Sequence, residues 1–279
     1  MKRFLFLSLC PLFFPGMCLA GPIIVGHTGG GSVATLDFAT GNESASFTTD
    51  GAAIDSRGRA VEVVGGTVYY AAISGDIHLA PYNNGLGGSD LGTIPNPRPG
   101  FGVQDLDFSN GILFALTGYS DGTPGTPVVY RLNPTTGAVI GSPVTINGPG
   151  GLADGFTVLP NGDFLINDND AVATYRSYSP TTGNPTGLVI TLPALAGTAT
   201  GVDYNPGDNL LYYAGRFTGA NPGLARTTLT GTFLGSVPIS TDGIEDISVI
   251  VPEPGTLVLC ICGLAGLMLM RWRTCTPEV

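Results

Sequence analysis

Residues 112–137 read ILFALTGYSDGTPGTPVVYRLNPTTG, and this unit recurs along the chain. Its branched and aromatic run is typical of a β-strand, and the turn residues that follow separate it from a second strand. Comparable strands begin 44, 45, 51 and 47 residues apart, at Ile23, Thr67, Ile112, Asp163 and Leu210. The glycines that close the second strands are 44, 52, 46 and 48 residues apart, at Gly41, Gly85, Gly137, Gly183 and Gly231. Two independent landmarks therefore share a period of about 45 residues.

A period of this length with several short strands per unit is typical of propeller blades. The third unit divides into the four strands VQDLDFS, ILFALTG, VVYRLNP and IGSPVTI, whereas the first unit lacks its opening strand. The segment GIEDISVI at 243–250 is left over and resembles the opening strand GVQDLDF. We therefore predict an all-β fold for residues 21–250, a five-bladed β-propeller in which the last strand completes blade one. A β-sandwich with coincidental spacing is the alternative.

The turns LNPTTG and YSPTTG resemble those of YncE-like and quinoprotein-type propeller repeats, although the tryptophans usual in the quinoprotein set are missing. This resemblance implies a similar blade architecture.

The composition limits the possible partners. Acidic residues outnumber basic ones 21 to 11, giving a formal charge of −10, and only 11% of residues are charged. Nucleic acid is excluded as a partner because phosphate binding requires clustered Lys and Arg. The region from 21 to 251 has no cysteine, lysine or tryptophan, which excludes both a disulfide framework and a thiolate metal site.

The N-terminus has the parts of an export signal. It begins with two cations, continues with apolar residues 4–14 and ends in CLAG at 18–21. We expect residues 1–20 to be a signal peptide, recognised by the secretion machinery and cleaved between Ala20 and Gly21. A lipoprotein signal at Cys18 is the alternative, which the preceding methionine disfavours.

The C-terminal segment 251–279 has the features of a membrane anchor. Residues 255–270 have no charge and would extend about 24 Å as a helix, slightly short of a comfortable membrane span. We predict a marginal transmembrane helix there. By the positive-inside rule, Arg271 and Arg273 in the basic tail hold the C-terminus in the cytoplasm. The body then lies outside, in agreement with the export signal.

The triplet Pro252, Glu253 and Pro254, followed by the apolar stretch and the two arginines, closely resembles a PEP-CTERM sorting signal. The resemblance implies that the chain is an exosortase substrate, with the triplet as the recognition motif and Arg271 with Arg273 as the retention cluster. It also implies a membrane-tethered intermediate, then a place at the cell surface or outside the cell, in association with exopolysaccharide. An ordinary anchor behind a proline-containing linker is the alternative.

Acidic residues occur in the opening strand of every unit, which in a propeller lines the central channel. They are Glu62, Asp105, Asp154, Asp203, Glu245 and Asp246. Converging carboxylates could bind Ca²⁺ or sugar hydroxyls, and a pair could cleave a glycoside. Alternatively, these carboxylates accept hydrogen bonds from backbone amides or are exposed to solvent.

The sequence has no G-x-S-x-G motif, P-loop or metal-binding motif, so we expect neither a catalytic residue nor a resident metal or cofactor. The expected function is a non-catalytic binding or structural component of the exopolysaccharide matrix. The alternative is an extracellular hydrolase or lyase that acts on glycans with channel carboxylates.

Overall fold

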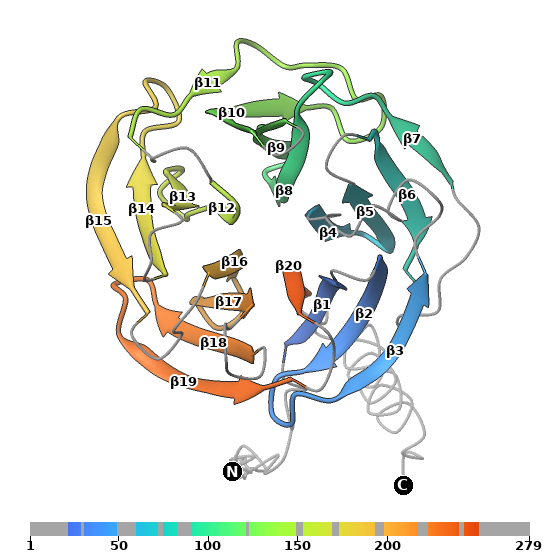
Figure 1. Cartoon of the computed structure of the whole chain (residues 1–279), viewed down its shortest axis with the longest axis vertical. Coiled ribbons are helices and arrows are strands. Elements are labelled where there is room, and N and C mark those ends of the chain that lie inside the picture. Colours follow the sequence, from blue (N-terminus) through green and yellow to red (C-terminus); the bar gives the residue numbers. More distant parts are fainter. Residues whose placement is uncertain are drawn as a thin grey trace, which may run out of the picture.

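The computed structural model describes residues 22–28, 31–48, 60–71, 75–82, 91–120, 123–148, 153–168, 173–192, 198–216, 223–239 and 243–250. These residues form five four-stranded antiparallel sheets, arranged as blades around a central axis (Figure 1). The expected signal peptide and sorting segment lie outside them. Within the described part of the chain, no helix is long and apolar enough to cross a membrane.

Each blade runs from an inner strand at the axis to an outer strand at the rim. Blade 1 consists of β20 (Ile244–Ile250), β1 (Ile23–Thr28), β2 (Ser32–Asp37) and β3 (Glu43–Thr48). Blade 2 consists of β4 (Ala60–Val64), β5 (Thr67–Ala71), β6 (Ile77–Pro81) and β7 (Gly92–Ile94). Blade 3 consists of β8 (Gly102–Ser109), β9 (Ile112–Ser120), β10 (Thr123–Leu132) and β11 (Val144–Thr145).

The last two blades follow the same order. Blade 4 consists of β12 (Phe156–Val158), β13 (Phe164–Asn167), β14 (Thr174–Tyr178) and β15 (Pro185–Thr191). Blade 5 consists of β16 (Thr198–Asn205), β17 (Leu210–Arg216), β18 (Gly223–Thr228) and β19 (Phe233–Pro238). The repeated strands identified in the sequence are therefore the second strand of every blade.

The ring closes as predicted. β20 pairs with β1 in antiparallel register, with Ile24 opposite Val249 and Gly26 opposite Ile247. The end of the described chain thus supplies the inner strand of the blade with which it begins. This pairing gives both strands hydrogen-bond partners that an open ring would lack.

The outer strand of blade 3 is shorter than predicted. The segment 140–146 was expected to form a strand, but the strand itself contains only Val144 and Thr145. The N–H groups of Ile140 and Ile146 still donate to carbonyls of β10. Pro143 has no N–H to donate to a ladder, which accounts for the late start of this strand.

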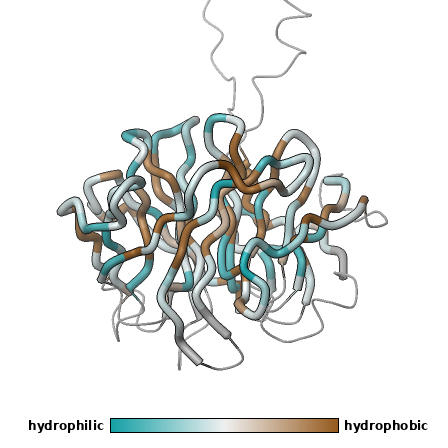
Figure 2. Tube along the Cα trace, turned by 90° about the horizontal axis from the view of Figure 1, so that it is seen from above, coloured by the Kyte–Doolittle hydropathy of each residue, from teal (hydrophilic) through white to brown (hydrophobic). Residues whose placement is uncertain are grey.

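Hydrophobic side chains fill the spaces between neighbouring blades. Five clusters of buried residues each combine side chains from two adjacent blades. Between blades 4 and 5, for example, the rings of Tyr175 and Tyr213 meet edge-to-face with centroids 4.9 Å apart. Figure 2 shows hydrophobic residues mainly along the strands and hydrophilic residues mainly in the turns. Burial between blades therefore holds the ring together.

The recurring turn glycine also has a packing role. Gly41, Gly137 and Gly183 all have φ near +70° (71°, 70° and 68°), a conformation that side chains with a Cβ rarely adopt. Each lies against the outer strand of the preceding blade: a Cβ at Gly183 would overlap the carbonyl oxygen of Thr145 in β11. The sequence period thus reflects both a turn and a blade-to-blade contact.

Candidate functional site

The inner strands have one edge that faces the channel. Backbone N–H groups on this edge donate hydrogen bonds to acidic side chains of neighbouring blades. Asp246 in β20 accepts a hydrogen bond from the backbone N–H of Val61 in β4, at 2.7 Å. Two residues further along, the Ser248 hydroxyl oxygen accepts a hydrogen bond from the backbone N–H of Val63, at 3.1 Å. β20 therefore connects blade 1 to blade 2 through its side chains.

The same arrangement recurs at two further junctions. Asp105 in β8 accepts the N–H of Phe156 in β12, at 2.5 Å. Asp107 accepts both the N–H of Val158 and the hydroxyl of Thr157, each at 2.6 Å. Where blade 5 meets blade 1, the Asp203 carboxylate of β16 accepts a hydrogen bond from the N–H of Val249 in β20, at 2.6 Å. Because an unsatisfied buried amide costs about 1–3 kcal/mol, these contacts stabilise the ring.

The structure separates the predicted site residues into groups. Glu62 and Asp203 line one mouth of the channel together with Asp107. Asp154 is buried but precedes β12 instead of lying within it, and the Gln104 amide donates to it at 3.4 Å. Glu245 is buried where the pairing of β20 with β1 shifts register.

Sequence reasoning missed Asp107. The alternation of side chains along a strand was the signal that could have found it, because Asp105 and Asp107 are two residues apart and therefore share a face.

Burial close to one another raises the pKa values of five of the channel carboxyl groups, those of Glu62, Asp105, Asp107, Asp203 and Asp246. Burial raises the pKa of Glu62 well above its usual value, and the charges of Asp203 and Asp107 add to the effect. Burial likewise raises the pKa of Asp107, to about 6, although the hydrogen bonds from Thr157 and Val158 oppose the shift. Burial is also the largest cause of the raised pKa of Asp105, followed by the charge of Asp246.

The channel mouth is a pocket of about 330 Å³. Glu62, Asp107 and Asp203 contribute carboxyl groups to it, and Asn110 and Tyr204 also line it. Among the described residues, no group of three His, Cys, Asp or Glu side chains is arranged to hold a metal ion. The possibility that the carboxylates bind Ca²⁺ therefore has no coordination geometry to support it there, and ligand binding by these residues stays a prediction.

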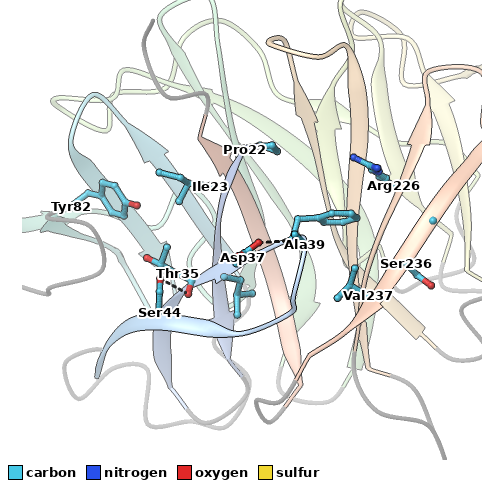
Figure 3. A pocket seen from close by; sticks show the side chains of 13 residues that line it. Pro22, Ile23, Thr35, Asp37, Ala39, Ser44, Tyr82, Arg226, Ser236 and Val237 are labelled. Carbon is cyan, nitrogen blue, oxygen red and sulfur yellow. Dashed lines mark hydrogen bonds between the residues drawn. The ribbon is translucent and has the colours of Figure 1, made fainter. Parts of the chain in front are cut away.

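A larger pocket of about 870 Å³ lies at the junction of blades 1 and 5 (Figure 3). Pro22, Ile23 and the end of β2 contribute to it from blade 1, Tyr82 from the end of β6, and Arg226 with residues 235–237 from blade 5. We call it the blade 1–5 pocket. Sequence reasoning missed it because its residues come from three blades with no regular spacing.

Two aromatic rings lie beside Arg226 at this pocket. The guanidinium of Arg226 lies 5.0 Å from the centre of the Phe38 ring. Phe38 in turn meets Tyr212 edge-to-face, with ring centroids 5.2 Å apart. A cation over an aromatic face is held by the ring quadrupole, so Arg226 has a defined position without a salt bridge.

Comparisons with known proteins support the fold alone. No family model matches the chain, and no curated protein matches it. A Bacteroides caccae protein of unknown function has a similar structure, with a TM-score of 0.55 and 12% identity over 83% of this chain and 99% of that one. Myxococcus xanthus glutaminyl cyclase is also similar, with a TM-score of 0.51 and 17% identity over 75% of this chain and 83% of the enzyme.

Proposed function

We propose that the chain is an exported binding or structural protein of the bacterial cell surface, without catalytic activity. Delivery rests on the motif 252–254, the apolar stretch 255–270 and the cluster of Arg271 and Arg273. The proposed place of action is the exopolysaccharide matrix, reached through a membrane-tethered intermediate and an exosortase.

The use of the channel carboxylates supports a non-catalytic role. Asp105, Asp203 and Asp246 are buried, and each accepts an amide hydrogen bond from a neighbouring blade. A general acid or nucleophile must reach its substrate, whereas these groups are engaged in holding the ring. They are therefore better suited to stabilising a scaffold than to performing chemistry.

A glycan hydrolase or lyase is the second candidate. Glu62, Asp107 and Asp203 surround the small pocket, and carboxyl groups with raised pKa values in a pocket are typical of catalytic acids. The release of reducing ends from a panel of polysaccharides tests this candidate. Activity that is present in the wild type and lost in Glu62→Gln would replace the non-catalytic proposal.

Delivery is tested by fractionation in a bacterium that has an exosortase. We expect the wild type to be shortened and associated with the surface or released, and Glu253→Ala to stay at full length in the cytoplasmic membrane. Glu278→Ala, in the same tail beyond the arginines, is the matched control and should behave as the wild type. If Glu253→Ala fractionates as the wild type does, the segment is an ordinary anchor.

A further inference from the structure

Arg226 differs from the other arginines whose side chains are described. Three of them donate a hydrogen bond to an oxygen: Arg98 to the carbonyl of Thr126, Arg131 to the carbonyl of Pro180, and Arg176 to the carboxylate of Asp168. The buried Nε of Arg226 has no hydrogen-bond partner. Within the described residues, no carboxylate lies within the 4.0 Å of its guanidinium that an ion pair requires.

The guanidinium of Arg226 contacts the Tyr212 hydroxyl, but its Nε has no hydrogen-bond partner and no described carboxylate neutralises its charge, so it is a candidate site for an anion. Desolvating a charge without a partner is unfavourable, and a carboxylate matches the fork of guanidinium donors with two hydrogen bonds. Gly235 lies opposite Arg226 in the pairing of β18 with β19, and a Cβ placed there would meet nothing within 4 Å. The outer strand therefore leaves open space beside the guanidinium.

The rest of the blade 1–5 pocket suits a sugar. Figure 3 shows Tyr82 on one side and Arg226 with Ser236 and Val237 on the other. Phe38 and Tyr82 offer aromatic surface, and Ser44 and Ser236 offer hydroxyl groups. A volume of about 870 Å³ lies within the range of ligand pockets and exceeds what one small carboxylic acid would fill.

We propose that the blade 1–5 pocket binds a saccharide that has a carboxylate, namely a uronic acid unit flanked by neutral sugars. Arg226 binds the carboxylate, and the neighbouring sugar units occupy the space toward Tyr82. Neutral flanking units are specified because the chain has a formal charge of −10, which repels a polyanion. This inference rests on the proposed binding function and gives it a site and a ligand class.

The test compares two oligosaccharides of equal length by isothermal titration calorimetry. The first probe is a hyaluronan tetrasaccharide, in which glucuronate alternates with N-acetylglucosamine, and the second is neutral chitotetraose. We expect the wild type to bind the first at least about tenfold more tightly, because a charge-assisted bidentate contact is worth this factor or more. Arg226→Gln should abolish this preference and Arg226→Lys should restore part of it, whereas Arg98→Gln, which removes a positive charge elsewhere, should keep it.

A second pair of variants covers the case in which Arg226→Gln unfolds. Ser236→Trp fills the pocket from an exposed position and should weaken binding of the glucuronate probe, whereas Ser46→Trp, exposed on β3 outside the pocket, should not. Equal binding of both probes by the wild type, absence of binding, or an unchanged preference in folded Arg226→Gln would each overturn the proposal. Fractionation of Glu253→Ala does not depend on this pocket, so failure of the ligand proposal is distinguishable from failure of the delivery proposal.

Discussion

The stability of this propeller should fall as the pH rises from acidic to neutral. Burial raises the pKa of the Asp107 carboxyl from 3.8 to about 6 in the folded protein. The folded state therefore keeps a proton that the unfolded chain releases above about pH 4, and stability is lost as the pH rises through the folded pKa. Glu62, Asp105, Asp203 and Asp246 are shifted in the same direction, mainly by burial.

The magnitude for Asp107 alone follows from its shift. A difference of about 2.2 pKa units corresponds to about 3 kcal/mol of unfolding free energy, most of it lost between about pH 4 and pH 7. The assay is urea unfolding followed by circular dichroism at a series of pH values. Asp107→Asn should reduce the fall by about this amount, because an amide does not titrate and its oxygen can still accept from Thr157 and Val158.

The matched control is Asp37→Asn. The Asp37 carboxylate also accepts a backbone N–H, that of Ala39 at 2.7 Å, but it is exposed. Because Asp37 lies outside the buried cluster of carboxyl groups at the channel, the fall of stability with pH should persist in this variant. A free energy of unfolding that is flat or rises over this range, or an Asp107→Asn profile parallel to the wild type, would refute the reasoning.

Two further predictions concern how the ring is assembled. Gly141→Ala (φ 70°) should lower the free energy of urea unfolding by about 1–2 kcal/mol because of its backbone conformation. Gly183→Ala (φ 68°) should lower it clearly more, because its Cβ would also overlap the carbonyl of Thr145. Equal losses would contradict this contact. A chain truncated after residue 239 lacks β20 and should lose cooperative thermal unfolding, whereas a chain truncated after residue 250 should keep it. Identical melting curves would show that ring closure is dispensable.

The blade period could be predicted from the sequence because the same structural requirement recurs from unit to unit. Gly41, Gly137 and Gly183 each fit a turn and a contact with the preceding blade, so their spacing follows the architecture. The closing strand was readable because the first unit lacked an opening strand and the sequence after the fifth unit supplied one.

The candidate site was harder to predict from the sequence because its hydrogen bonds join residues of different blades. Asp107 bonds to Val158, 51 residues further along, and Asp246 bonds to Val61, 185 residues earlier. Convergence of acidic residues was predictable from strand position, but the amides that they bind depend on how neighbouring blades are placed. Arg226 belongs to no sequence motif, and the missing partner of its Nε could be seen only in three dimensions.

The pairing of β20 with β1 also determines when the ring can be completed. Blades 2 to 5 are each built from contiguous sequence, whereas blade 1 combines Ile23–Thr28 with Ile244–Ile250. During synthesis from the N-terminus, blade 1 lacks its inner strand until β20 has emerged. Because β1 and β20 are so far apart in the sequence, their pairing forms late. A closed ring therefore requires that the whole body has emerged, and an interrupted chain leaves one edge of β1 without its partner strand.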